Sequence, residues 1–225
     1  MAVAGTCKIQ IMSDLHLETH PSYDYDFPQT APHLALLGDI GHVVNEQLIQ
    51  FLTRFDLTEE ITVLGCTLFS HVATEQAMAV QSRLVDFRDI LSWDVGDHVD
   101  AHLEDLQWLN LLVSELAQQG RKIIIFTHHS PTTDQRARNP RFAISDVSTG
   151  FATDLSKEEC WTNPAVSIWA FGHTHYSCDF TTDHGKRVVA NQKGYYLIPQ
   201  KAFQSGKVIE VAGAMSSHTI ASQDN

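Results

Sequence analysis

Four short apolar runs in this chain each end within two residues of an Asp or a His, and this recurrence constrains the fold more than any other feature. The runs cover residues 8–13, 33–37, 121–127 and 165–171. Their length and their β-branched and aromatic content are typical of strands, and segments of helical period lie between them. The alternation predicts an α/β domain in which several strands end in polar residues.

The residues that follow these runs are types that bind metals. They are Asp14 and His16 after the first run, Asp39 after the second, His128 and His129 after the third, and His173 and His175 after the fourth. Ligands of open α/β sheets bind beyond the carboxyl ends of strands, so we expect these four ends to converge on one rim. Donors two residues apart in an extended segment share one face and reach one ion. The sequence therefore predicts a metal centre.

The adjacent residues His128 and His129 are expected to have different roles. Side chains alternate along a strand, so only one of the two should face the site. We expect His128 to be the ligand and His129 to support it. Carboxylate and imidazole donors together favour Mn, Fe, Co or Zn over calcium. Gly38 and Gly172 precede predicted ligands and would allow the backbone to turn sharply there.

Composition narrows the classes of protein. A chain of 225 residues fits one domain, which we place at residues 1–212 with a polar tail at 213–225. The formal net charge of -12 argues against binding to nucleic acid or to an anionic membrane. The four cysteines lack CxxC spacing, which favours reduced thiols. No targeting segment or membrane-spanning stretch is recognisable, so we expect a soluble, cytoplasmic protein.

Periodicity predicts the remaining elements. They are a short helix through Leu48 and Phe55, a strand at 61–69, a helix from Ala77 to Leu91, and a hairpin at 180–190 that turns at Asp183-His184-Gly185. A longer helix is expected to begin at Asp100 and to end at Gly120. Its buried stripe would hold Leu103, Leu106, Leu109, Val113 and Leu116, together with Trp108. His42, His98 and His102 have no matching partners and are expected at the surface or at helix ends.

The motifs Asp14-Leu15-His16, Gly38-Asp39, Thr127-His128-His129-Ser130-Pro131 and Gly172-His173-Thr174-His175, in this order, resemble those of the calcineurin-like metallophosphoesterase superfamily. Residues 63–70, 86–87 and 191–195 also resemble cytosolic members of that family. The resemblance implies a four-layer α/β/β/α sandwich with two divalent or trivalent metal ions at the rim. It implies that Asp14, His16 and His175 hold the first ion, that His128 and His173 hold the second, and that Asp39 bridges them.

Two cations a few Å apart neutralise a phosphate, orient it and acidify a bridging water, so the expected reaction is hydrolysis of a phosphomonoester or a phosphodiester. The substrate would be a phosphorylated small molecule or protein, and the catalytic residues would be Asp39, His128 and His173. The long polar connection at 130–164 has the character of a functional loop. Arg136 and Arg138 in this connection, with Arg141 as a further candidate, are expected to contact the substrate phosphate together with His129.

One family motif, GNH, has no equivalent here. In the family its Asn binds the second metal and its His is a candidate acid. Only one short helix fits between Asp39 and the strand at 61, and Asn45-Glu46 lies at a helix start with no strand to aim it. The fold is therefore predicted to lack one strand-helix unit, and we expect the second metal site to be weakened.

Two interpretations of Cys66 stay open. The strand at 61–69 either occupies the position vacated by the GNH strand, with Cys66 as a zinc ligand, or it keeps a downstream position, with Cys66 as a small buried hydrophobe. Two classes of function also stay open. One is a hydrolase with a compromised dinuclear site, and the other is a non-catalytic metal-binding or scaffold protein, such as a shortened isoform.

Overall fold

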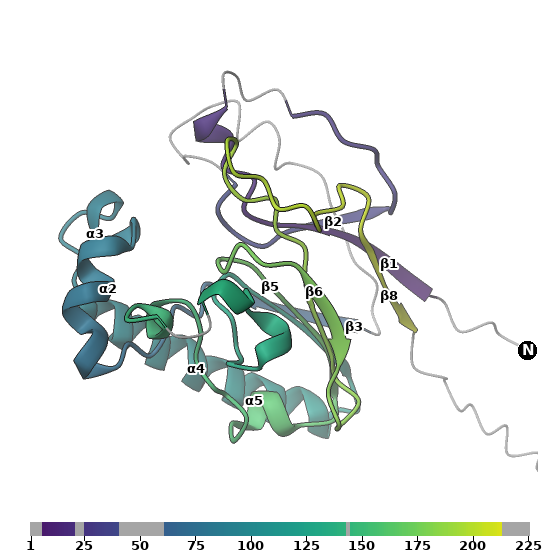
Figure 1. The fold of residues 1–225 in the computed structure, drawn as a ribbon. Coiled ribbons are helices and arrows are strands. Elements are labelled where there is room, and N and C mark those ends of the chain that lie inside the picture. The colour runs from purple at the N-terminus through teal and green to yellow at the C-terminus, as the bar shows by residue number, and fades with distance from the viewer. Residues whose placement is uncertain (1–5, 21–24, 41–60, 143–144, 213–225) are drawn as a thin grey trace, which may run out of the picture.

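Two β-sheets form the centre of the molecule. The computed structural model describes residues 6–20, 25–40, 61–142 and 145–212 (Figure 1). A three-stranded sheet has the order β2-β1-β8 and consists of β1 (Thr6–Met12), β2 (His33–Leu36) and β8 (Val208–Ala212). A five-stranded sheet has the order β3-β4-β5-β7-β6 and consists of β3 (Ile61–Cys66), β4 (Lys122–Thr127), β5 (Val166–Phe171), β6 (Cys178–Thr181) and β7 (Arg187–Ala190).

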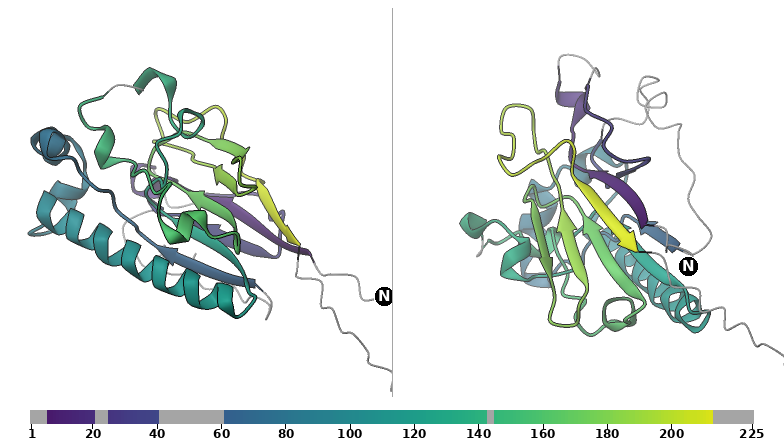
Figure 2. Two further views of the ribbon diagram at one scale, coloured as in Figure 1. Left: turned by 90° about the horizontal axis from the view of Figure 1, so that it is seen from below. Right: turned by 90° about the vertical axis from the view of Figure 1, so that its right-hand side faces the viewer.

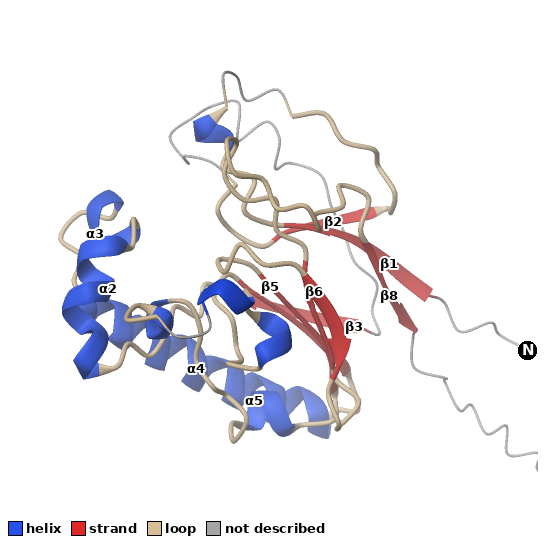
Figure 3. Ribbon diagram, viewed as in Figure 1, coloured by secondary structure: helices blue, strands red, loops and turns tan. Residues whose placement is uncertain are grey.

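The two sheets pack face to face, as Figure 3 shows. Ile9 and Ile11 of β1 share a buried core with Ile124 of β4 and Ile168 of β5. On β4 the neighbouring Ile123 and Ile125 belong to a second core on the opposite face of the sheet. The strand alternation therefore gives the five-stranded sheet two apolar faces, one covered by a sheet and one by helices.

Helices α4 (Val95–Gln118) and α5 (Glu159–Thr162) cover the outer face of the five-stranded sheet. Helices α2 (Ala77–Arg83) and α3 (Asp86–Asp89) pack against the start of α4. The long helix α4 runs beneath this sheet (Figure 2), where its Leu109 and Val113 pack with Trp169 of β5. The predicted α/β sandwich is confirmed. The helix predicted through Leu48 and Phe55, Asn45-Glu46, His42 and the tail at 213–225 lie outside the described residues.

Helix α4 differs from the prediction at its start and along its buried stripe. Its N-cap is Asp94, whose side chain accepts from the Asp97 amide in a reciprocal capping box, so Asp100 lies inside the helix. The two predicted core residues Leu103 and Trp108 are 48% and 39% exposed. The stripe begins instead with two buried histidines, His98 and His102. Aliphatic periodicity alone missed the stripe because its first two turns are built from imidazoles.

Two further boundaries were predicted wrongly, and one strand was missed. The helix predicted at 77–91 is broken after Arg83, because Leu84 takes an extended conformation that lets it pack in a core with Val80. The strand at 61–69 ends at Cys66, because Leu68 and Phe69 have positive φ angles that no strand tolerates. Strand β8 was not predicted at all. The hairpin of β6 and β7 is confirmed, with Gly185 at a φ of 83° in its turn.

Strand β3 decides between the two interpretations of Cys66. It pairs in parallel with β4 in the five-stranded sheet, whereas β2, which carries Asp39 beyond its end, belongs to the other sheet. Cys66 packs against the α4 side of the sheet, where burial and the carboxylate of Asp105 raise the pKa of its thiol to about 12. The structure therefore bears out the second interpretation, with Cys66 as a partly buried side chain of the core that faces α4. All four cysteines are free, and among the described residues no helix is both long and apolar enough to span a bilayer.

Candidate metal centre

The predicted ligands gather in two adjoining clusters where β1, β2, β4 and β5 end. Cluster one consists of Asp14, His16, Asp39 and His175, and cluster two of His128, His129 and His173. Within each cluster the candidate ligand atoms all lie within 4.8 Å of one another. The convergence expected from the sequence is present, and it extends to His129.

Cluster one has the spacing of ligands around a single ion. His16 Nε2 lies 3.1 Å from His175 Nε2 and 3.6 Å from Asp39 Oδ2. His175 Nε2 lies 3.2 Å from Asp14 Oδ1. Ligands bonded to one ion at about 2.1 Å are roughly 3 to 3.5 Å apart, which matches these separations. Glu18 lies 2.9 Å from His16 Nδ1 and so turns Nε2 of that ring toward the cluster.

Asp14 is a fully buried carboxylate whose charge is compensated locally. It accepts hydrogen bonds from the Ser13 hydroxyl and from the backbone N–H of His173, the latter at 3.1 Å. These bonds join the end of β1 to the end of β5 across the gap between the sheets. A buried anion held in this way provides a fixed negative site for a cation.

Cluster two is oriented by backbone carbonyls. His128 Nδ1 donates to the carbonyl of Leu37 at 2.9 Å, which leaves its Nε2 facing Asp39 Oδ1 at 3.5 Å. His173 Nε2 donates to the carbonyl of Gly150 at 3.2 Å, which leaves its Nδ1 as the available donor atom. A hydrogen bond from one ring nitrogen fixes the tautomer and the direction of the other. Both rings are therefore set to bind a cation.

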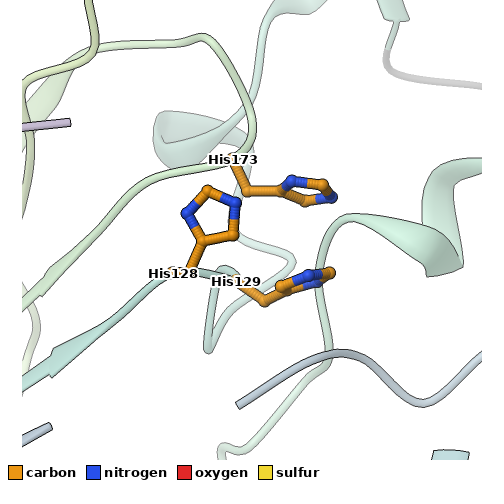
Figure 4. Close-up of side chains that lie close together, drawn as sticks. All are labelled: His128, His129 and His173. Carbon is orange, nitrogen blue, oxygen red and sulfur yellow. The ribbon is translucent and has the colours of Figure 1, made fainter. Parts of the chain in front are cut away.

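His129 lies beside these two rings and not in the position expected for a partner of substrate. Figure 4 shows its ring stacked with that of His173, and the ring centroids are 3.9 Å apart with planes inclined by 27°. The opposite face of His173 stacks on Phe151, at 4.8 Å. His129 is fully buried, so the contact with substrate predicted for it is not supported.

Asp39 lies between the two clusters, with one carboxylate oxygen toward His16 and the other toward His128. Burial would raise the pKa of Asp39, but the hydrogen bond and charge of His128 hold that pKa well below its usual range. Burial likewise opposes protonation of His128, but Asp39 overrides it and raises the pKa of His128 to about 9. The two groups thus form an ion pair, and a cation that binds His128 Nε2 would displace the proton held there.

The backbone of the ligand residues is unusual. Among the described residues, eight non-glycine residues have positive φ angles, and five of these are Asp14, His16, Asp39, His173 and His175. Such conformations cost on the order of 1 to 3 kcal/mol each and cluster at functional sites. Gly38, with a φ of 98°, passes so close to His128 that a Cβ would overlap the imidazole ring. Donor types, spacing and backbone geometry together fit a pair of borderline divalent ions.

A cavity of about 630 Å³ opens beside the clusters. Asp39, His173, His175 and Tyr195 are part of its lining. The lining also includes the apolar residues Leu84, Val85, Val147 and Phe151 and the polar residues Thr132, Thr133, Arg138 and Asn139. The site thus has room for an organic group next to the predicted ions.

Of the three arginines predicted to contact the substrate phosphate, one lines the cavity and two do not. Arg138 lines the cavity. Arg136 is paired with Asp134 at 2.7 Å and lies over the ring of Phe180, outside the cavity lining. Arg141 is exposed and also lies outside that lining. The ion pair with Asp134, two residues earlier, occupies the guanidinium of Arg136, and its contact with substrate stays a prediction.

Three residues at the site were not predicted from the sequence. Tyr195 packs against His16 and His175, with ring centroids 4.4 and 4.7 Å away. It lies in the 191–195 stretch, whose family likeness was the available signal. Glu18, two residues after His16, had the spacing of an orienting carboxylate. Phe151 gave no signal, because only the folded loop brings it to His173.

No protein-family model matches the sequence, and no curated protein matches it significantly. The structure is similar to that of the phosphopantetheinyl hydrolase PptH from Mycobacterium tuberculosis, with a TM-score of 0.59 over 86% of this chain and 91% of the other, at 13% identity. The chain has a metallophosphoesterase-like fold. A dimetal phosphatase from Danio rerio matches with a TM-score of 0.33 over 49% of this chain and 38% of the other, at 14% identity, which is too partial to bear on the fold.

Proposed function

We propose that this protein is a metal-dependent hydrolase of phosphate esters. The observation that carries the proposal is the position of Asp39, whose two oxygens face two separate sets of imidazole and carboxylate donors beside an open cavity. A carboxylate in that position suits the bridge of a dinuclear centre. The similar structure with the higher TM-score is named as a hydrolase, which agrees with the proposal.

The metal ligands in this proposal are Asp14, His16, Asp39 and His175 on one side and His128 and His173 on the other. When bound, two divalent ions would supply the positive charge that holds a phosphate and would lower the pKa of a water between them. The chain's own residues keep the donors in place, through the Glu18 carboxylate and the carbonyls of Leu37 and Gly150. Preorganisation of this kind makes electrostatic stabilisation effective.

The lining of the cavity suits a substrate that has a phosphate and an organic group. The phosphate would bind beside Asp39 and His175, with Arg138 of the lining adding positive charge. The apolar residues of the lining, such as Leu84 and Val147, would contact the organic group of the ester. The substrate is thus proposed to be a phosphate ester with a partly apolar organic group.

The test is turnover of an aryl phosphomonoester and an aryl phosphodiester by metal-free protein to which Mn²⁺, Co²⁺ or Zn²⁺ is added. We expect metal-dependent hydrolysis that Asp39→Asn abolishes. Asp183→Asn, in the exposed turn between β6 and β7, is the matched control and should keep full activity. Metal binding without turnover of either ester would contradict the proposal and leave a non-catalytic metal-binding protein.

A further inference from the structure

His129 is a buried polar side chain without a partner. It is 0% exposed, and neither of its ring nitrogens has a hydrogen-bond partner in the described part of the chain. Leaving such a group unsatisfied is destabilising, because its hydrogen bonds to water are lost and not replaced. Its nearest rings are those of His173, His98, His128 and Phe69, at 3.9, 5.4, 5.5 and 5.6 Å between centroids.

The neighbouring imidazoles each make one hydrogen bond of their own, and none of them is a hydrogen-bond partner of His129, although His98 Nδ1 also lacks a partner among the described residues. His173 donates to Gly150, His128 to Leu37, and His98 Nε2 pairs with Ser70. Both ring nitrogens of His129 are thus left without a partner in the described part of the chain. A neutral imidazole with a free lone pair is a metal ligand by chemistry.

We propose that His129 is the third imidazole ligand of the second metal site, together with His128 and His173. The ligand atoms of these three residues lie within 4.8 Å of one another, and Asp39 faces His128 from the other side. His129 would thus supply the donor that the missing GNH motif leaves absent from the sequence. The inference rests on the proposed metal centre, and its ligand is a borderline divalent cation such as Zn²⁺ or Co²⁺.

The stack of His129 on His173 has a consequence for binding. An ion bound to an imidazole nitrogen lies close to the plane of that ring, whereas two stacked rings with planes inclined by only 27° do not share a point close to both. One ring must therefore turn when the second ion binds, which breaks the stack. We expect the second ion to bind more weakly than the first for this reason.

The test titrates metal-free full-length protein with Co²⁺ and follows binding by calorimetry and by cobalt absorption. We expect two steps for the wild type. His129→Phe keeps an aromatic ring for the stack but removes both nitrogens, and it should weaken the second step by about tenfold or more while leaving the first unchanged. His184→Phe, at an exposed turn histidine, controls for loss of one imidazole and should leave both steps unchanged.

The inference is overturned if the wild type binds a single ion per chain, or if His129→Phe has the wild-type second step or loses both steps equally. Thermal unfolding of the metal-free variant checks its fold. If the variant does not fold, ¹⁵N NMR of the histidine side chains of the wild type is recorded during addition of Zn²⁺. A His129 signal that does not shift contradicts the proposal. Neither readout uses hydrolysis, so a protein that binds both ions without turnover refutes the proposed function alone.

Discussion

At the scale of single residues, the metal centre combines strained backbone with buried charge. Asp14, His16 and Asp39 all have positive φ angles, and their side chains bring carboxylates and imidazoles close together. Neither feature stabilises the fold by itself. Both are compensated by local bonds, such as that from the His173 amide to Asp14. The ligand positions are therefore held by neighbours, and small changes in those neighbours should be felt at the site.

Gly38→Ala tests this at one residue. The alanine Cβ would overlap the ring of His128, and the φ of 98° is unfavourable for any side chain. We expect the free energy of unfolding to fall by about 2 kcal/mol and the affinity of cluster two for Co²⁺ to fall as well. Gly65→Ala is the control, because its Cβ would meet the Phe126 carbonyl at an ordinary 3.6 Å. Equal stabilities of the two variants in urea unfolding would contradict the argument.

At the scale of elements, α4 shows where the sequence was informative and where it was not. Its stop at Gly120, with a φ of 72°, was predictable because only glycine takes that conformation easily. Its start was not, because Asp94, Asp97 and Asp100 are all plausible caps and only the reciprocal bonds at Asp94 decide. Its buried histidines were invisible to a search for aliphatic periodicity.

The capping assignment gives a direct test. Asp94→Ala removes the acceptor of the Asp97 amide and should lower the free energy of unfolding by about 1 kcal/mol. Asp100→Ala, in an exposed position inside α4, should leave stability unchanged or slightly higher, because alanine is the better helix former. Chemical denaturation of both variants measures the difference. A larger loss for Asp100→Ala would mean that the helix begins there.

The buried face of α4 also predicts a dependence of stability on pH. Burial, with the nearby charge of His102, lowers the pKa of His98 to about 4. Below pH 6.5 the unfolded chain binds a proton at this residue that the folded chain does not bind until about pH 4. Stability is therefore complete above pH 6.5 and is lost as the pH falls toward 4, by about 1.4 kcal/mol per pH unit for this group.

His98→Gln removes that titration. Between pH 6.5 and 4.5 the free energy of unfolding of the variant should therefore fall less steeply with pH than that of the wild type, by a slope that corresponds to close to one proton. The variant should be less stable at pH 7.5, because His98 Nε2 accepts the Ser70 N–H at 3.2 Å in the wild type. Urea unfolding at several pH values measures both effects, with the exposed His184→Gln as the control. A slope identical to that of the wild type would show that His98 is not the group that titrates.

At the scale of the whole molecule, the site joins the two sheets. Asp14, His16 and Asp39 follow strands of the three-stranded sheet, whereas the histidines of cluster two and His175 follow β4 and β5 of the other. The sequence could predict this convergence, because strand ends and donor types are local signals. It could not predict which sheet β3 joins, because strand pairing depends on partners distant in the chain. Two interpretations of Cys66 stayed open for that reason.

Because the ligands come from both sheets, metal should act as a cross-link of the fold. An ion that binds only the folded chain stabilises it by about 2.7 kcal/mol at a hundredfold excess over the dissociation constant. For a chain of this length, this corresponds to a rise in Tm of roughly 5 to 10 °C. Thermal unfolding with Zn²⁺ and with a chelator measures the shift. The Asp39→Asn variant should lose most of this rise in Tm, because Asp39 faces both clusters, and the Asp183→Asn variant should retain it. Equal Tm values with metal and with chelator would show that the clusters hold no ion tightly enough to join the sheets.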